Sequence, residues 1–471
     1  MKIAILHYHL NTGGVTRVIH QQAGILRSQG HEVILLSGEP PPVSLEVPVE
    51  VVQGLAYDHG ERSPAPAKEV AVQIMKAVGR HWTDLPDVLH IHNPILAKNS
   101  QIINILNELQ KNSIPLLCQV HDFAEDGRPN VFFHGPYPSN CHYAVINLRD
   151  YEILKAAGLS SRGLHYLPNA VSPWTGEPDD KAATRGTVLY PVRAIRRKNI
   201  AEAILLHYCR HPHRQLLITL PPTSTPDMAA YALWRRFVAE QGLNVVFEAG
   251  LQNDFKWLTS QCDYVLTTSI TEGFGFVFLE AWTGSKLLSG RKLPDICQDF
   301  INHGIQLNHL YRCLGIPLSW INELELHQIW LQTIHRAARK LSISLPAEWI
   351  ASGWQQITST GHIDFGLLDE GHQHQILCKV IQDKGARDQL RDGNSAMNPP
   401  ANPANYQEMI EGNRQAVLRH YGIPRYRENL MGVYDQVVTH PVKHAVDKKT
   451  VAMHFLAANT FSLLKWRPFH G

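Results

Sequence analysis

The sequence predicts an α/β protein made of two doubly wound domains, each with a parallel sheet. The first observation is the length, because 471 residues are too many for a single hydrophobic core. The second is that short apolar runs alternate with helix-length amphipathic stretches up to about residue 290, which is typical of parallel sheets covered on both faces. The third is that this alternation begins twice, with a polar segment without periodicity between the two series.

The first series of elements predicts the amino-terminal domain. Residues 2–6 form an expected buried strand, and residues 16–28 an expected helix. Because the opening MKIAILHYHL is too short and too polar for a signal peptide, we assign it to that first strand. Further apolar runs predict strands at residues 31–37, 87–92, 114–120 and 142–147.

The second series predicts another domain of the same Rossmann-like kind, with a helix from Asn199. Polar residues 172–186 separate the two series, so we place the domains at residues 1–175 and 176–400. Ligands of open parallel sheets bind outside the carboxyl ends of the strands, so the two domains are expected to face a cleft. The expected strands are at residues 187–192, 215–220, 245–250 and 263–269; beyond the sheet, helices are expected at 326–341, 407–419 and 427–438.

Composition excludes several classes of protein. A formal charge of +2 on so long a chain argues against a nucleic-acid-binding surface. The seven cysteines are dispersed, with no CxxC pair and none close to another, which favours reduced thiols and a cytoplasmic protein. No segment reaches the ~20 apolar residues of a membrane-spanning helix. The chain is therefore expected to be a globular, cytoplasmic protein.

A glycine-containing turn follows the strand expected at 263–269. The turn begins the stretch TEGFGFVFLEAW, residues 271–282. Gly273 and Gly275 allow a tight turn and the close approach of a ligand. Backbone N–H groups near Phe274, Gly275 and Phe276 would then point outward at a helix start, which suits a phosphate.

Two glutamates bracket this turn. Glu272 lies just before it, and Glu280 is expected two turns into the following helix. A carboxylate accepts hydrogen bonds from vicinal hydroxyls, so one glutamate suits a sugar and the other a ribose. Sugar, diphosphate and ribose together describe a nucleotide sugar, although any strand–glycine–helix turn can carry two surface glutamates.

A basic stretch, YPVRAIRRKNI, follows the first strand of the second domain. Arg193 and Lys198 stand on either side of its strand-to-helix turn, where cations can neutralise a diphosphate. Arg196 and Arg197 are expected in solvent. The bland alternative is a charged surface turn with no ligand.

Corresponding positions in the first domain also carry glycines and histidines. Gly13 and Gly14 follow the first strand and permit close approach to the expected cleft, without a dinucleotide-binding fingerprint. His121 follows the strand expected at 114–120, where it could line a sugar pocket or be structural. The histidine pairs in HIHN (90–93) and GHQH (371–374) have no identifiable third ligand, so no metal site is predicted.

Five motifs occur along the chain in the order GGVTRV, VHD, LPNAV, VRAIRRKN and EGFGFVFLE. Taken in this order, they resemble retaining glycosyltransferases of the GT-B fold, family 4. The likeness covers residues 1–290 or so and resumes weakly in YGIPRYRENLMGVYDQV. It implies an acceptor-side first domain, a nucleotide-sugar-binding second domain with a divergent helical region at 295–400, and helices over 401–471 that cross back to the first domain. One departure is Asn199, where the family often has glycine after the lysine.

The resemblance assigns roles to the matching residues. Glu272 would bind hydroxyls of the donor sugar, and Glu280 would bind the ribose. Arg193 and Lys198 would stabilise the leaving diphosphate, and His121 would line the sugar site. The implied donor-binding residues around these are Gly13, Gly14, Gly273, Phe274, Gly275 and Phe276.

The implied reaction moves a sugar, with a hexose favoured, from a nucleotide diphosphate sugar to a hydroxyl acceptor with retention, and no further cofactor is required. Polar and aromatic loops at 56–66 and 122–140 favour a small sugar derivative or a glycan as acceptor. Lysines beside the amphipathic tail leave a lipid-linked acceptor and a weak peripheral membrane contact open. An epimerase-like enzyme and a non-catalytic sugar-nucleotide binder remain alternatives, and the oligomeric state is not predicted.

Overall fold

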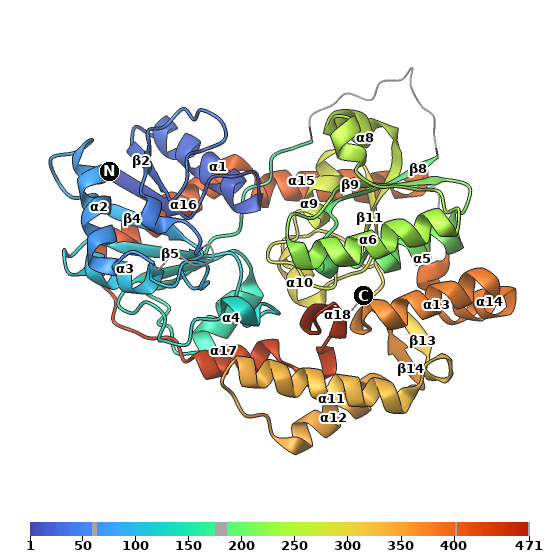
Figure 1. Cartoon of the computed structure of the whole chain (residues 1–471). Helices are drawn as coiled ribbons and strands as arrows, with labels where there is room; N and C mark the ends of the chain where they lie inside the picture. The colour runs from blue at the N-terminus through green and yellow to red at the C-terminus, as the bar shows by residue number, and fades with distance from the viewer. Residues whose placement is uncertain (59–63, 175–185, 401–402, 470–471) are drawn as a thin grey trace. The chain divides into compact units, whose positions relative to one another are not determined.

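The computed structural model describes residues 1–58, 64–174, 186–400 and 403–469 (Figure 1). The predicted domain boundary at 175/176 lies outside the described residues. The chain folds into two compact units. The first unit comprises Met1–Ala170, Arg339–Ile343 and Ile423–Phe455, and the second comprises Val171–Ala338, Ser344–Gly422 and Leu456–Gly471.

The first unit contains a seven-stranded parallel sheet in the order β3-β2-β1-β4-β5-β6-β7. Its central strands are buried along their whole length, which is why they read as continuous apolar runs. The two three-residue edge strands, β3 and β7, are too short for such a signal. The strands are β1 (Lys2–His7), β2 (Glu32–Ser37), β3 (Val49–Val51), β4 (Val88–His92), β5 (Leu116–Val120), β6 (His142–Val145) and β7 (Leu164–Tyr166).

Helices cover both faces of this sheet. On one face α2 and α3 lie side by side (Figure 1), and on the other α1 packs with α16, which is supplied by a distant part of the sequence. Tyr434 of α16 donates to, or accepts from, His90 Nδ1 on β4 at 2.8 Å. The helices are α1 (Gly14–Ser28), α2 (Ala67–Gly79), α3 (Ile102–Gln110), α4 (Leu148–Ala156), α16 (Ile423–Thr439) and α17 (Lys448–Phe455).

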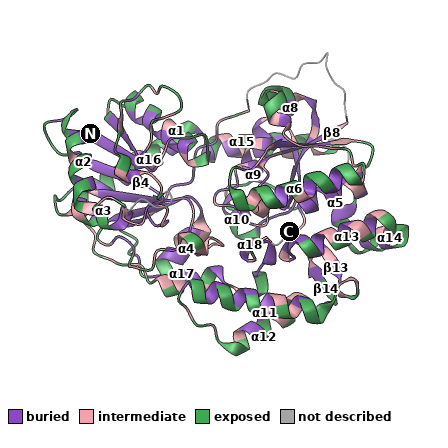
Figure 2. Ribbon diagram, in the orientation of Figure 1, coloured by how far each residue is buried: buried purple, intermediate pink, exposed green. Residues whose placement is uncertain are grey.

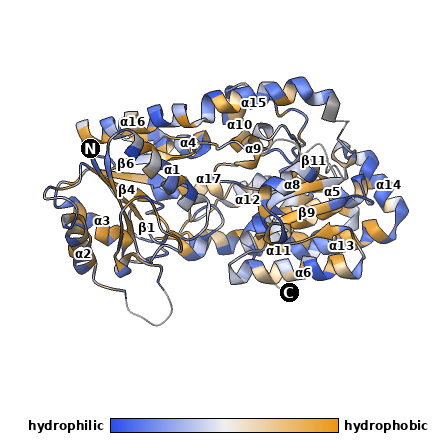
Figure 3. Cartoon of the chain, turned by 90° about the horizontal axis from the view of Figure 1, so that it is seen from above, coloured by the Kyte–Doolittle hydropathy of each residue, from blue (hydrophilic) through white to orange (hydrophobic). Residues whose placement is uncertain are grey.

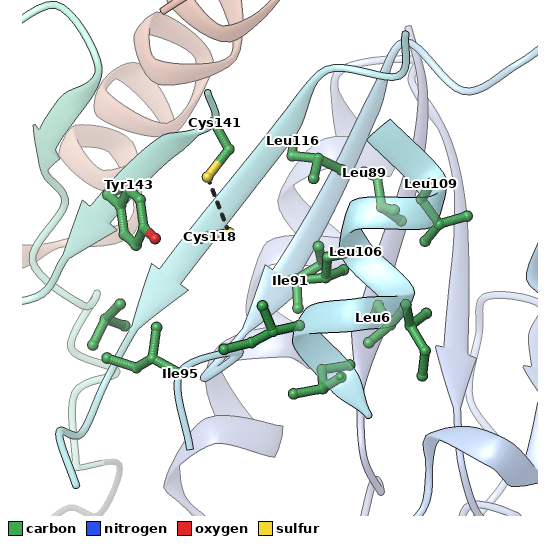
Figure 4. Close-up of a cluster of buried hydrophobic side chains, with 14 of the residues drawn as sticks. Leu6, Leu89, Ile91, Ile95, Leu106, Leu109, Leu116, Cys118, Cys141 and Tyr143 are labelled. Atoms are coloured by element: carbon green, nitrogen blue, oxygen red, sulfur yellow. Dashed lines mark hydrogen bonds between the residues drawn. The ribbon is translucent and has the colours of Figure 1, made fainter. Parts of the chain in front are cut away.

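The core beneath α3 contains two thiols that the sequence did not bring together (Figure 4). Cys118 Sγ and Cys141 Sγ lie 3.7 Å apart, so the expectation that no cysteine is close to another holds in sequence but is wrong in space. A disulfide needs about 2.05 Å between its sulfurs, and both cysteines are free thiols. The contact with Cys141 and burial raise the pKa of the Cys118 thiol, which keeps it protonated.

The second unit contains a five-stranded parallel sheet in the order β10-β9-β8-β11-β12. A two-stranded antiparallel pair, β13–β14, lies apart from it. The expected strand at 245–250 is wrong beyond its second residue, because Glu248 is left-handed (φ 61°) and a short helix follows. The strands are β8 (Thr187–Arg193), β9 (Gln215–Leu220), β10 (Val245–Val246), β11 (Cys262–Thr267), β12 (Leu287–Gly290), β13 (Gly315–Pro317) and β14 (His362–Asp364).

Helices surround this sheet, with outer faces that are exposed in Figure 2. The strands of both sheets are predominantly hydrophobic in Figure 3, whereas α14 is predominantly hydrophilic. The helices are α5 (Ile200–Arg210), α6 (Thr225–Glu240), α7 (Ala249–Gln252), α8 (Phe255–Gln261), α9 (Val277–Thr283), α10 (Pro294–Asn302), α11 (Glu323–Lys340), α12 (Ala347–Thr358), α13 (Glu370–Gln382), α14 (Lys384–Gly393), α15 (Gln407–Tyr421) and α18 (Leu463–Trp466).

The amphipathic tail is broken rather than one continuous helix. Helix α17 ends at Phe455, and its apolar residues are buried within the first unit. The chain then enters the second unit, where Phe461 and Trp466 are buried. Lys448 Nζ donates to the carbonyls of Phe133 and Gly135. Across the described ranges, no helix is long and apolar enough to span a bilayer.

Candidate functional site

The carboxyl edge of the second sheet reverses its strand order between β8 and β11. The chain winds from β8 outward through β9 and β10 on one side, and through β11 and β12 on the other. Such a switch point opens a crevice where ligands of α/β sheets bind. The loop after β8 contains the short 3-10 helix η3 (Arg196–Lys198), and the loop after β11 runs from 268 to 276.

Backbone hydrogen bonds tie these two loops together. Ile270 N donates to Arg197 O at 3.0 Å. The hydroxyl of Thr268 donates to the carbonyls of Lys198 and Asn199, each at 3.0 Å. The η3 turn and the loop after β11 therefore hold one another in place on the sheet edge.

Asn199 occupies a position that requires an unusual backbone. Its φ of 53° and ψ of 58° lie in the left-handed region, which glycine and asparagine adopt most easily. Its side chain donates to Glu202 Oε2 at 2.6 Å and accepts from Gln373 Nε2 at 3.0 Å. The departure from the expected glycine thus preserves the turn and adds two buried hydrogen bonds.

Lys198 and Glu272 meet at the switch point. Lys198 Nζ donates to Glu272 Oε1 in an ion pair, with side-chain exposures of 15% and 8%. Burial would raise the pKa of Glu272, but the charges of Lys198 and Arg197 outweigh that effect and hold the pKa below its ordinary value. A charged carboxylate and an ammonium group are therefore kept side by side at the switch point.

The other basic residues of this turn differ from expectation. Arg193 ends β8, is half-buried, and donates through Nη1 to Pro221 O at 3.0 Å. The prediction that Arg196 is in solvent is wrong. Its side chain is 13% exposed and makes a two-pronged ion pair with Glu370, and Nη1 donates to Arg467 O at 2.7 Å. Arg197 is half-buried, so the expectation that it lies in solvent is met only in part.

The stretch 273–280 forms the expected turn but a later helix start. Helix α9 begins at Val277, so Glu280 is half-buried in the first helical turn, not two turns in.

Gly275 has φ +84°, and a Cβ there would lie 2.9 Å from Phe278. Phe274 is buried with its ring 4.9 Å from that of Phe276, while Gly273 is half-buried. Gly275 therefore serves both the backbone and the packing.

Gly13, Gly14 and His121 belong to the first unit, whereas the other predicted site residues belong to the second. Gly13 is the extended residue before α1, and Gly14 is the first residue of that helix. Both are exposed, and a Cβ on Gly14 would meet nothing within 4 Å. Neither backbone conformation nor packing within the chain requires glycine at these two positions.

His121 is the end of a buried histidine stack. Its Nε2 lies 2.9 Å from His92 Nδ1, and the two rings stack at 5.1 Å. His92 stacks in turn on His90 at 4.5 Å. Burial lowers the pKa of His121 to about 4 and that of His90 to about 3, so the stack is neutral at pH 7.

The stack links the HIHN motif to His121, which sequence reasoning treated separately. A signal for this contact was present in the sequence. His92 is the last residue of β4, and His121 directly follows β5, the neighbouring parallel strand. Over the described part of the chain, no group of three histidine, cysteine or acidic side chains is arranged to hold a metal ion.

Comparison with known proteins adds sequence and fold relatives. Residues 12–159 match the family model described as Glycosyltransferase Family 4. The mannosylglucosyl-3-phosphoglycerate synthase of Petrotoga mobilis is 27% identical over 337 residues. That alignment covers 63% of this chain and 66% of the relative, just under two thirds of its length.

Solved structures share the fold at low sequence identity. Sucrose-phosphate synthase from Thermosynechococcus elongatus has a TM-score of 0.56 and 16% identity, covering 92% of this chain and 98% of that one. HepE from Anabaena, solved in complex with UDP-glucose, has a TM-score of 0.53 and 12% identity, with coverage of 92% and 98%. The expected architecture of two doubly wound α/β domains is confirmed. The chain has the GT-B fold, and residues 12–159 are similar to glycosyltransferase family 4.

Proposed function

We propose that this chain transfers a hexose from a nucleotide diphosphate sugar to a hydroxyl acceptor with retention of anomeric configuration. The observation that carries the proposal is the Lys198–Glu272 ion pair at the switch point of the second sheet. It places a cation for a diphosphate beside a carboxylate for sugar hydroxyls, both held by two loops that brace each other.

The donor would lie along the carboxyl edge of that sheet. An ammonium group has three donors, so Lys198 can keep Glu272 and still bind a phosphate oxygen. Glu272, kept charged by its neighbours, would accept hydrogen bonds from the sugar hydroxyls. Glu280 would accept those of the ribose, and the turn through Gly275 would let the diphosphate approach the backbone.

The reaction would depend on stabilising the leaving group. The acceptor oxygen bonds to the anomeric carbon, while the bond from that carbon to the diphosphate oxygen breaks and its electron pair stays with the diphosphate. The acceptor proton passes to the departing phosphate oxygen, on the same face of the sugar. Arg193 and Lys198 would offset the negative charge that develops there.

Two features of the first unit support roles near the sugar or acceptor. Gly13 and Gly14 are exposed in a loop whose own conformation does not require glycine, which favours close approach by a ligand. His121 is neutral and fixed by His92, so it can exchange hydrogen bonds with a hydroxyl without adding charge.

The family relatives guide the test. Purified protein is incubated with UDP-glucose, the donor seen with HepE, then with GDP- and ADP-sugars, each with and without sugar acceptors. We expect acceptor-dependent release of the nucleoside diphosphate, with product of the donor's anomeric configuration in the initial NMR spectra. Product of inverted configuration would contradict retention. Nucleotide binding without release for any pair would favour a non-catalytic binder.

A further inference from the structure

The first sheet has its own switch point, between β1 and β4, and its carboxyl edge is basic. The chain winds from β1 outward through β2 and β3 on one side, and through β4 to β7 on the other. His9 follows β1, Lys98 follows β4, and Tyr57 comes from the loop after β3. The three side chains meet at this edge.

The tyrosine hydroxyl is the centre of this cluster. Lys98 Nζ donates to Tyr57 Oη at 2.9 Å, and His9 Nε2 lies 3.1 Å from the same oxygen. The ammonium group also lies 4.6 Å from the centre of the tyrosine ring. The geometry fixes three polar groups around one point while all three residues remain half-buried, and so partly open to solvent.

Lys98 is a partly buried charge without a carboxylate. No carboxylate oxygen of the described residues lies within 4.0 Å of its Nζ. Burial, followed by the nearby charge of Arg128, lowers the pKa of Lys98, and the charge of Asp122 offsets only part of this effect. Withdrawing an ammonium group from water is unfavourable unless an anion compensates, and a tyrosine hydroxyl supplies no charge.

The acidic groups around the cluster already have partners. Asp122 forms an ion pair with Arg128 at 2.9 Å. Asp58 accepts from Ser100 N at 2.8 Å, and Glu39 accepts from Asn11 Nδ2 at 3.2 Å. The local arrangement therefore leaves Lys98 as the charge that an incoming anion would neutralise.

We propose that Lys98 and Tyr57, with His9 positioning the tyrosine, bind an anionic oxygen group of the acceptor, either a phosphate or a carboxylate. The inference rests on the proposed glycosyl transfer and adds the acceptor's chemical class. Lysine supplies charge. His9 Nδ1 accepts from Asn11 N, so its Nε2–H points at Tyr57 Oη, and the tyrosine keeps its own proton to donate to an oxyanion. A neutral sugar would leave the Lys98 charge uncompensated and is the poorer ligand.

Calorimetric titration without any nucleotide tests this site apart from the donor site. The probes are 3-phosphoglycerate, glycerol 3-phosphate, glycerate and neutral glycerol, added to the full chain. We expect the anions to bind and glycerol not to bind. Glycerol 3-phosphate and glycerate separate phosphate from carboxylate recognition. Equal, undetectable binding of all four would overturn the proposal, whatever the donor titrations give.

Matched variants locate the binding. Lys98→Met should weaken anion binding by about tenfold or more, as expected for the loss of a charge-assisted hydrogen bond. Lys111→Met is the control, because Lys111 follows α3 and precedes β5, at the opposite edge of the sheet, and pairs with Glu108. Equal weakening in both variants, or in neither, would overturn the assignment.

A stability measurement excludes a merely structural lysine. Removing a partly buried charge that forms no ion pair among the described residues should leave the melting temperature of Lys98→Met unchanged or raise it. A lysine that held the fold together would give the opposite sign. A lower melting temperature together with unchanged anion affinity would therefore assign Lys98 to the fold and remove it from the acceptor site.

Discussion

Lys198 and Glu272 illustrate how single residues are tuned by their neighbours. Both are largely buried, and the charge of Lys198 lowers the pKa of Glu272. Arg197 adds a second positive charge near Glu272. Removal of either member would leave the other charge buried without its partner, which costs about 3 kcal/mol or more.

The pH dependence of stability follows from the lowered pKa of Glu272. A carboxylate with a folded pKa below its unfolded value of about 4.5 stabilises the fold above that value, and loses the contribution as pH falls through the folded pKa. At pH 7 we expect the melting temperature of wild type to exceed that of Glu272→Gln. The difference between the two melting temperatures should shrink below about pH 4.5. Thermal melts of both proteins from pH 3 to pH 7 measure it. A melting-temperature difference that grows as the pH falls would contradict the lowered pKa of Glu272.

Transfer should be sensitive to the two cations of the second switch point. Arg193→Ala or Lys198→Ala should slow transfer by about 30- to 1000-fold, because each loses a contact of roughly 2–4 kcal/mol to the leaving diphosphate. Steady-state kinetics on folded protein measure this, with Lys256→Ala on the exposed surface of α8 as control. Near-normal transfer rates in both variants would contradict the proposed role of Arg193 and Lys198 in stabilising the leaving diphosphate.

At the scale of elements, the junction between η3 and α5 sets the position of Lys198. Asn199 provides its left-handed residue and hydrogen bonds to Glu202 and Gln373. The sequence marks this junction only as an asparagine after a lysine. The reason for asparagine lies in both the backbone angle and the partners, which come from α5 and α13.

Substitutions at Asn199 should separate these two contributions. Asn199→Gly loses the side-chain bonds but keeps the left-handed backbone, whereas Asn199→Ala loses the bonds and also strains the backbone. We expect alanine to be less stable than glycine by about 1 kcal/mol, and both to be less stable than wild type. Urea unfolding measures the order. An alanine variant as stable as wild type would show that neither contribution matters.

Elements were predictable from sequence where burial was uniform. Strands such as β4, β5 and β9 are continuous apolar runs, so their positions are confirmed within two residues. The short strand β12 was missed because its four residues precede a polar, irregular segment. Glu280 was placed too deep in its helix, since the left-handed Gly275 delays the helix start to Val277.

Site contacts were harder to predict because their partners are distant in sequence. Residue types and their place after strands pointed to Lys198 and Glu272. Their pairing required the parallel order of β8 and β11. Arg196 was expected in solvent because its partner, Glu370, lies 174 residues away. The histidine stack likewise required the register of β4 against β5.

At the scale of the whole molecule, the chain passes between its two units several times. Residues 423–455 complete the first unit through α16 and α17, and the following residues return to the second. In that last segment, Arg467 pairs with Asp369 and accepts from Arg196 through its carbonyl. The end of the described chain thereby supports the turn that carries Lys198.

Calorimetric titration of the whole protein with UDP-, GDP- and ADP-sugars tests the proposed donor site most directly. We expect one nucleotide series to bind, and Glu280→Ala to weaken that binding while Lys256→Ala does not. The weaker binding of Glu280→Ala would follow from the missing hydrogen bonds to the ribose. Binding that is unchanged in Glu280→Ala, or absent for every nucleotide sugar, would contradict a donor site at the β8–β11 switch point.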